Sequence, residues 1–218
     1  MNALPGVYLT WDPSEEAADS FLRYQVYRRL VGDTSWSKLA RITDQAVAFY
    51  SDYRVPATGD DYEYAVTQVI DVGGEEVESE FPSLVSASTL ARSTFLHPVS
   101  MPERYVEYLA NVSAVAITPE VVYLQPWSRR LPTAHISPVQ RREYQVDAHQ
   151  SWLDYRELWE TMRDFVDLQY DAGAVFLLRH ARTHAYVQID SLNREDDGSV
   201  MFNAPVRFTE VFYREEVD

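Results

Sequence analysis

The chain has 218 residues, no cysteine and a formal net charge of −15. The lack of cysteine excludes disulfides, thiolate metal sites and cysteine nucleophiles, and the acidic balance disfavours general nucleic-acid binding, which needs a basic face for the phosphates. No apolar run is long enough to cross a membrane and no basic, apolar leader opens the sequence. We therefore expect a soluble chain made in the cytoplasm, without membrane insertion, divided into two domains at residues 1–90 and 91–218.

The first domain is predicted as a series of short strands. Apolar residues recur at every second position, most clearly around Tyr62, Tyr64 and Val66, and Gly73-Gly74 suits a hairpin turn. Short strands at this spacing, separated by Gly, Pro and Asp, are typical of an antiparallel β-sandwich. The expected strands lie at 7–11, 24–29, 36–42, 49–55, 61–70 and 77–86.

Ordered motifs in this region resemble the signature of fibronectin type III domains over residues 4–88. They are LTWD at 9–12, YQVYR at 24–28 and YEYAV at 62–66, with Trp36 and Asp52 between them. The resemblance implies that Trp11 fills the core and that Tyr62 bonds back to the preceding corner. Both would be structural markers of the fold. The family's first strand is very short here, so the N-terminal edge is expected to be open or covered by a neighbour.

The second domain is predicted to hold one helix against an antiparallel sheet. Apolar residues from Trp152 to Val166 recur at three and four positions, and Gly173 suits a helix end, which places the helix at about 151–172. Ser151 with Asp154 resembles a capping box. A linker is expected at 88–102, and strands at 105–108, 112–117, 121–124, within 127–146, and at 175–178, 185–189, 200–202 and 206–212. The fold class is therefore mostly β, a sandwich followed by an α+β sheet or split barrel.

The order of elements across 91–218 is similar to that of minor or distal tail proteins of tailed bacteriophages. The motifs are WSRRLP at 127–132, YREL at 155–158 and VRFTEV at 206–211. This resemblance implies a virion tail subunit, assembled in the host cytoplasm, that forms a ring, expected to be a hexamer, with partners among tube and hub proteins. DNA would pass through the ring without specific binding, and the sandwich would project outward and contact host-surface polysaccharide.

Four arginines are candidate assembly residues in this acidic chain. Arg129, Arg130, Arg141 and Arg142 form two basic pairs. In a ring, such pairs can meet the acidic flank of the next subunit through a heterologous contact. Two alternatives stay open, a solvated loop and a contact with nucleic acid.

An enzymatic function is not predicted, and neither a cofactor, a metal nor a catalytic residue is expected. His180 and His184 have the spacing of two zinc ligands, but they flank a predicted strand turn in solvent, so a metal-dependent hydrolase is a weak alternative. His97 is expected in a loop, and the acidic clusters at 15–19, 60–61 and 75–80 in solvated turns. The main alternative function is an accessory carbohydrate-binding or spacer protein of a bacterial surface or a secreted enzyme, monomeric and with exposed aromatic platforms.

Overall fold

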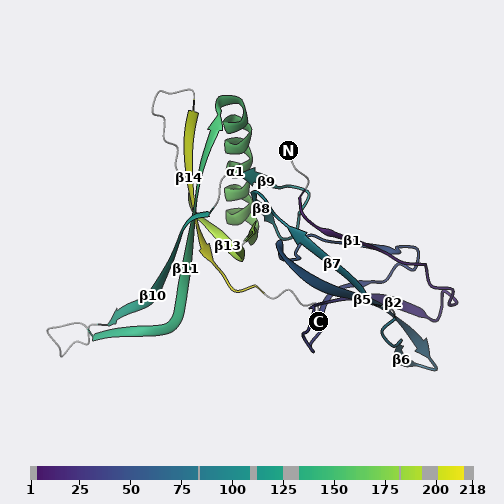
Figure 1. The fold of residues 1–218 in the computed structure, drawn as a ribbon. Coiled ribbons are helices and arrows are strands. Elements are labelled where there is room, and N and C mark those ends of the chain that lie inside the picture. The colour runs from purple at the N-terminus through teal and green to yellow at the C-terminus, as the bar shows by residue number, and fades with distance from the viewer. Residues whose placement is uncertain are drawn as a thin grey trace. The chain divides into compact units, whose positions relative to one another are not determined.

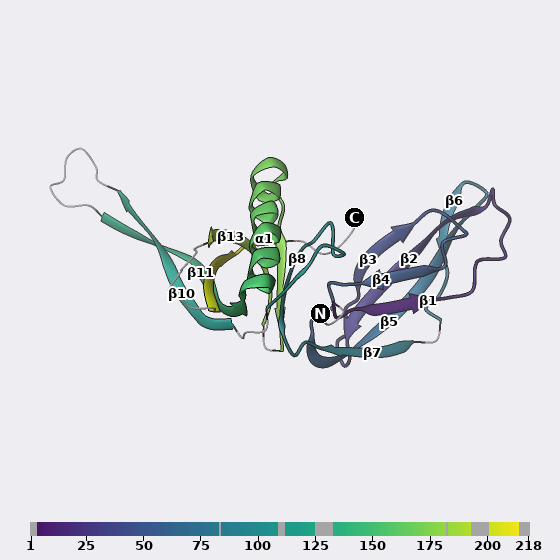
Figure 2. The same ribbon diagram turned by 90° about the horizontal axis from the view of Figure 1, so that it is seen from above.

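The computed structural model describes residues 4–82, 84–108, 112–124, 133–181, 183–192 and 201–213. It is mostly β, and the described residues contain one helix. The chain divides into two compact units (Figures 1 and 2), which we call the N-terminal unit, Ala3–Ala91 with Tyr213–Asp218, and the C-terminal unit, Arg92–Phe212 with Met1–Asn2. The predicted fold class, a β-sandwich and an α+β sheet with one helix, is confirmed.

The N-terminal unit is a sandwich of two antiparallel sheets. One sheet pairs β1 with β4, and the other has the order β3-β2-β5-β6, with β7 pairing the opposite end of β5. Alternate residues of the two sheets meet in a core around Val26, Leu39 and Tyr64. The strands are β1 (Val7–Thr10), β2 (Phe21–Leu30), β3 (Ser37–Ile42), β4 (Phe49–Asp52), β5 (Thr58–Val72), β6 (Glu75–Glu78) and β7 (Val85–Leu90).

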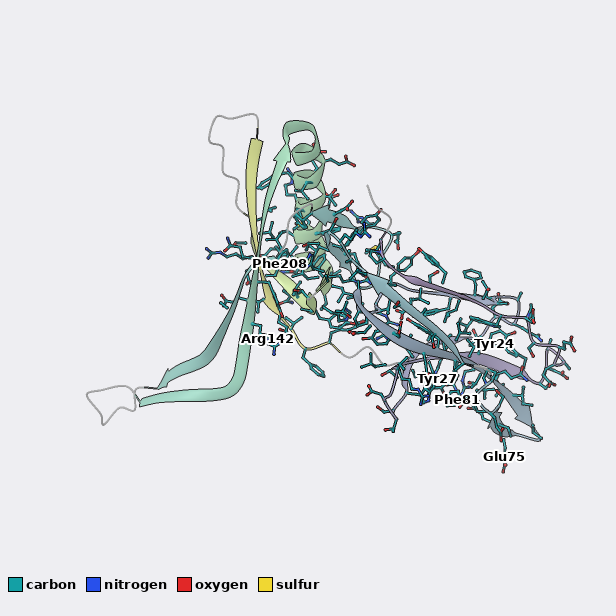
Figure 3. All side chains as sticks on the ribbon, viewed as in Figure 1. Tyr24, Tyr27, Glu75, Phe81, Arg142 and Phe208 are labelled. Carbon is teal, nitrogen blue, oxygen red and sulfur yellow. The ribbon has the colours of Figure 1, made fainter. Side chains whose placement is uncertain are left out.

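The last predicted strand of this unit, 77–86, is interrupted between β6 and β7. In the interruption, the Phe81 ring packs against two other rings, edge-on to Tyr27 at 5.3 Å and stacked on Trp36 at 4.9 Å (Figure 3). Pro82, which follows, has no N–H to give to a ladder. Packing of Phe81 on these rings therefore competes with strand pairing. The predicted hairpin turn is confirmed, with Gly73 and Gly74 both at positive φ, where glycine is favoured.

The C-terminal unit is a seven-stranded antiparallel sheet with the order β10-β11-β14-β13-β12-β8-β9. Three predictions are wrong in detail. The expected linker 88–102 contains a strand, the runs 112–117 and 121–124 form one strand, and so do 200–202 and 206–212. The elements are β8 (Thr94–Pro98), β9 (Val106–Tyr108), β10 (Val112–Leu124), β11 (Thr133–Ser151), α1 (Trp152–Ala172), β12 (Phe176–His180), β13 (Thr183–Leu192) and β14 (Met201–Glu210).

Strand β8 lies between β12 and β9, and all five of its residues are buried. A strand buried on both faces has no polar–apolar alternation. The segment Thr-Phe-Leu-His-Pro therefore resembled a linker in the sequence. His97, expected in a loop, belongs to this strand and is fully buried.

Helix α1 packs its apolar face on the sheet. Met162 and Phe165 are fully buried, the Tyr108 hydroxyl donates to the Met162 sulfur at 2.9 Å, and the Phe165 and Phe176 rings lie 5.2 Å apart. Burial of each such side chain contributes about 1.5–3 kcal/mol. The helix ends as predicted at Gly173, whose φ is 63° and whose N–H bonds to the Gln169 carbonyl at 2.9 Å.

The sheet is curled so that its two end strands approach each other. Tyr108 ends β9 and Val112 begins β10, yet these strands are at opposite ends of the strand order. Four steps of at most 3.8 Å keep the two Cα atoms within about 15 Å. Helix α1 contacts β9 at one end of the sheet and β11, β13 and β14 nearer the other. This arrangement is a split barrel with the helix on its inner side.

Candidate functional site

The most unusual feature of the C-terminal unit is a two-stranded ribbon that leaves the sheet (Figures 1 and 2). The ladder between β11 and β14 ends at Glu143, which pairs with Thr209. Before Glu143, β11 pairs with β10 alone among the described strands. We call residues 117–124 and 133–142 the arm. Its ladder breaks after Pro119, and Pro138 lies in the same break, where a residue without an N–H is tolerated.

Among the described strands, none beyond β10 and β11 pairs with the arm. A two-stranded ribbon is marginally stable in water without a further strand or a helix against it. Strand β10, at the edge of the sheet, has the sequence VSAVAITPEVVYL, in which Glu120 is the one charged residue. Long, apolar edge strands readily pair with another chain. The arm therefore has the properties of a contact surface for a partner.

Two of the four candidate arginines belong to the arm. Arg141 pairs with Thr118 and Arg142 with Ile117, so both lie in β11 and not in the loop that was left open as an alternative. Of these two side chains, that of Arg142 is described, and it is exposed. Arg129 and Arg130, with the motif 127–132, lie outside the described residues.

The root of the arm is fixed by polar contacts to β14. The Tyr144 hydroxyl donates to Glu210 Oε2 at 2.8 Å, and Arg142 Nε lies 3.9 Å from the same oxygen. The pKa of Tyr144 is raised to about 12. Partial burial is the larger cause, and the hydrogen bond to Glu210 is the second. The Arg142 side chain is 55% exposed (Figure 3), so its attraction to Glu210 is weak and most of the guanidinium stays accessible.

The exposed face of α1 is acidic. Five exposed carboxylates accompany one exposed arginine, Arg163, in the part of the helix whose side chains are described. The described last turn contains Asp171 and no basic residue, although the helix dipole favours cations at that end. Arg104 offsets part of the charge through Asp164, at 3.3 Å. The carboxylates are Glu157, Glu160, Asp164, Asp167 and Asp171.

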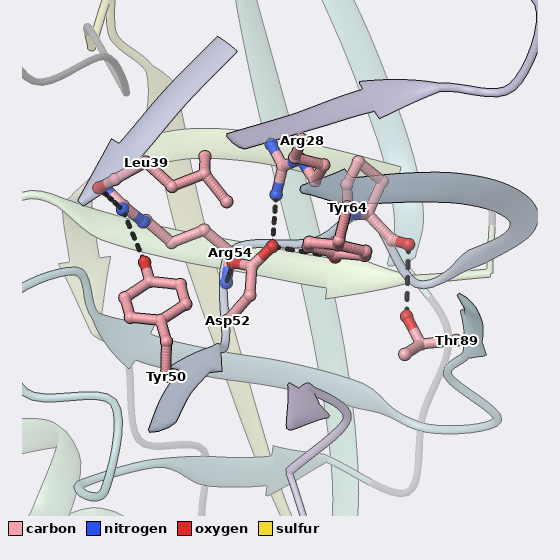
Figure 4. Close-up of polar contacts among 8 residues, drawn as sticks. Arg28, Leu39, Tyr50, Asp52, Arg54, Tyr64 and Thr89 are labelled. Atoms are coloured by element: carbon pink, nitrogen blue, oxygen red, sulfur yellow. Dashed lines mark hydrogen bonds and ion pairs between the residues drawn. The ribbon is translucent and has the colours of Figure 1, made fainter. Parts of the chain in front are cut away.

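A buried ionic network in the N-terminal unit joins its two sheets (Figure 4). Asp52 in β4 is fully buried and accepts hydrogen bonds from Arg28 at 2.8 Å and Tyr64 at 2.9 Å. Its other oxygen accepts from the Arg54 main chain at 2.9 Å. Burial is the larger cause that raises the pKa of Tyr64, and the negative charge of Asp52 raises it further. Because every oxygen of Asp52 is engaged with the protein, this network is structural.

The two fold markers inferred from the sequence lie beside this network. Trp11 and Tyr62 are half-buried and pack against the core of the sandwich. The fully buried tyrosine bonded through its hydroxyl is Tyr64, which sequence reasoning did not single out. Its inward position in the alternation of β5 was the available signal, since a tyrosine in a core needs a hydrogen-bond partner.

His180 and His184 lie in two consecutive cross-strand pairs of the β12–β13 hairpin, His180 with Thr183 and His184 with Arg179, so their side chains point to opposite faces of the hairpin. Both histidines are half-buried, so the expectation of a solvent-exposed turn is wrong. Within the described residues, no three His, Asp or Glu side chains are placed to hold a metal ion. The helix among those residues is too polar to cross a membrane.

Comparison with protein-family models gives no match for the chain, and comparison with curated proteins gives none either. Its function is therefore argued from the geometry above.

Proposed function

We propose that the chain is a structural subunit of a bacteriophage tail that assembles into a ring around the DNA channel. The observation that carries this proposal is the arm, a long ribbon whose outer strand is almost without charge. Such a strand is stable when a second chain covers it. Other tail proteins, of the tube and the hub, are the expected partners above and below the ring, and the location is the virion tail.

The proposed mechanism is assembly through strand pairing and charge. The outer edge of β10 in one protomer meets the neighbouring protomer, and repetition of a heterologous contact around an axis closes a ring, expected to contain six copies. The acidic face of α1 offers carboxylates to basic side chains of a neighbour, such as Arg142, which is largely accessible. Arg141, Arg129 and Arg130 are candidates for the same role.

The charge of the chain supports a channel through which DNA passes without binding. With a net charge of −15, a wall formed by such subunits repels phosphates and keeps DNA from adhering. The N-terminal unit projects outward in this proposal and contacts polysaccharide of the host surface.

A second function, an accessory carbohydrate-binding or spacer protein, is favoured by one observation. Tyr8 and Phe49, on the outer face of the β1–β4 sheet, are 63% and 61% exposed, and exposed aromatic rings can stack on sugars. Unlike the ring subunit, this protein would be a monomer, and the arm would have no partner.

The test is the mass of the native particle, with imaging of rings, and a pair of proline variants on β10. Neighbouring residues of a strand direct their N–H groups to opposite sides. Of Val115→Pro and Ala116→Pro, one therefore interrupts the ladder to β11 and the other blocks the outer edge alone. Hydrogen exchange of β11 identifies which is which.

We expect rings in the unmodified protein, and an intact fold without rings for the outer-edge variant. A monomer at all protein concentrations, or rings unaffected by both prolines, contradicts the proposal.

A further inference from the structure

The N-terminal unit contains a cavity of about 410 Å³ at one side of the sandwich. Three segments and Tyr24 of β2 form its walls. The segments are the end of β1 at 9–12, the middle of β5 at 64–68, and the interruption between β6 and β7, through Ser79, Pro82 and Val85. The cavity lies wholly within this unit.

Two gaps in strand pairing produce the cavity. Among the described strands β1 pairs with β4 alone, so the smaller sheet ends at β1. In the larger sheet, β7 pairs with β5 up to Tyr64 and β6 from Val69 onward, so residues 65–68 have no strand opposite them on that side. Ser79 spans one end of the gap through hydrogen bonds with the Gln68 main chain, at 2.9 and 3.2 Å.

The gap directs main-chain groups toward the cavity. Because Gln68 bonds to Ser79 across this edge, the N–H and C=O of Val66, two residues earlier in the strand, point to the same edge. Trp11, on the opposite wall, has a buried Nε1–H without a hydrogen-bond partner. Its ring lies 5.5 Å from that of Tyr24, edge-on, and both rings line the cavity.

The residues that line the cavity favour a neutral ligand over an anionic one. Of the residues that line the cavity, Asp12 is the one with a charged side chain, and none is Arg, Lys or His. An anionic ligand would have no cation to meet. A neutral ligand with hydroxyl groups suits these walls, since a hydroxyl can accept from Trp11 and donate to Asp12.

The size of the cavity and the position of its walls favour a compact ligand. The volume lies in the lower part of the range of small-molecule sites, about 300–1,000 Å³. Walls on three sides leave room for a compact ring, and the segment between β6 and β7 obstructs an extended peptide strand along β5.

We infer that this cavity binds one neutral, hydroxyl-bearing ring, a single sugar residue of a neutral polysaccharide. The apolar face of the sugar packs against Trp11 and Tyr24, and its hydroxyls reach the Trp11 N–H, the Asp12 carboxylate and the Val66 main chain. This inference rests on the outward, polysaccharide-contacting role of the N-terminal unit in the proposed function, and it is independent of ring formation.

The test uses the full chain against an array of neutral and anionic oligosaccharides, followed by titration with the neutral sugar that binds. Trp11→Phe keeps an aromatic ring and removes the N–H, and we expect it to weaken binding about five- to tenfold. Trp159→Phe, a matched change at a half-buried tryptophan of α1 that does not line the cavity, and Phe49→Ala, on the exposed aromatic face, are expected to leave the affinity unchanged. Thermal unfolding of each variant verifies the fold.

Three results overturn the inference: no neutral sugar binds, anionic sugars alone bind, or Trp159→Phe or Phe49→Ala weakens binding as much as Trp11→Phe. The native mass of the same samples separates the two proposals. A monomer that binds sugar through Trp11 overturns the ring and supports the cavity. A ring that binds no neutral sugar overturns the cavity alone.

Discussion

The edge strands of the β3-β2-β5-β6 sheet and strand β10 of the seven-stranded sheet differ in charge. In the N-terminal unit, edge strand β6 has the sequence EEVE with all four residues exposed, and the other edge, β3, contains Lys38, the one lysine of the chain. In the C-terminal unit, edge strand β10 has one charge in thirteen residues. Charged, short edges oppose pairing with other chains, and long apolar edges favour it. In the proposed ring, β10 would therefore be a contact edge, whereas β6 and β3 would not.

The interiors differ as well. The sandwich joins its sheets partly through a buried ion pair, Arg28 with Asp52, whereas the cluster that packs against α1 is apolar, with Arg179 and His97 fully buried elsewhere in the same unit. A buried pair is strongly sensitive to the loss of one partner. An apolar core responds mainly to lost volume.

The largest effect is expected from placing charged residues on edge strand β10, as edge strand β6 already has. Ala114→Lys together with Ala116→Lys places charges on the edge strand, opposite Gln145 and Glu143 within the chain. We expect complete loss of rings, measured by native mass spectrometry and light scattering. Val77→Lys, on the edge that is already charged, should leave the mass unchanged. Rings that survive both lysines would show that β10 is not the contact edge.

The next effect concerns the buried pair. Asp52→Ala leaves Arg28 buried without its carboxylate, and we expect the N-terminal unit to lose about 3–5 kcal/mol of its free energy of unfolding. Urea unfolding followed separately in the two units measures the loss. The control is Glu76→Ala, which removes an exposed partner of Arg23 and should not change stability measurably. Equal effects of the two variants would contradict the structural role of the network.

A smaller effect is expected at the end of α1. Gly173→Ala meets no steric obstacle, since a Cβ there has no neighbour within 4 Å, but the residue has a φ of 63°. An L-residue in this region costs about 1 kcal/mol. Thermal unfolding of the C-terminal unit measures it. Gly173→Asn should cost less, because asparagine tolerates this conformation better. If alanine is neutral, the helix end does not depend on the glycine.

The smallest effect is a dependence on alkaline pH. In the folded chain the pKa of Tyr144 is raised from 10.0 to about 12, so between these values the unfolded chain releases a proton that the folded chain keeps. Its contribution to stability is fully present below pH 10 and is lost as pH rises toward 12. Chemical unfolding across this range should show a shallower decline for Tyr144→Phe. An identical decline would exclude Tyr144 as its source.

Periodicity in the sequence was sufficient to predict most of the sandwich strands and α1, because each has one solvent-exposed face and one buried face. It failed at β8, which is buried on both faces. It also divided β14 at Pro205. That residue pairs with Asp147 of β11, and the described ladder to β13 ends at Val206, so among the described residues proline has a strand neighbour on one side only.

The candidate sites were less accessible to sequence reasoning. The arginine pairs identified positive charge but not that Arg141 and Arg142 belong to one strand, β11. The arm could not be foreseen, because it depends on where the β14 ladder ends. The cavity beside Trp11 results from the packing of Phe81, a long-range contact that no local pattern contains.

Strand β8 has a consequence for the order of events during synthesis. Its neighbours are β9, a few residues later, and β12, which follows the helix. All seven strands of the sandwich lie before Ala91, whereas the sheet of the C-terminal unit cannot close until β14, which joins β11 to β13, has left the ribosome. Domains generally fold as units, the N-terminal one first. We therefore expect the nascent chain to carry a folded sandwich while the sheet that contains the proposed contact edge is still incomplete, and we expect the proposed association of subunits to wait until synthesis is nearly over.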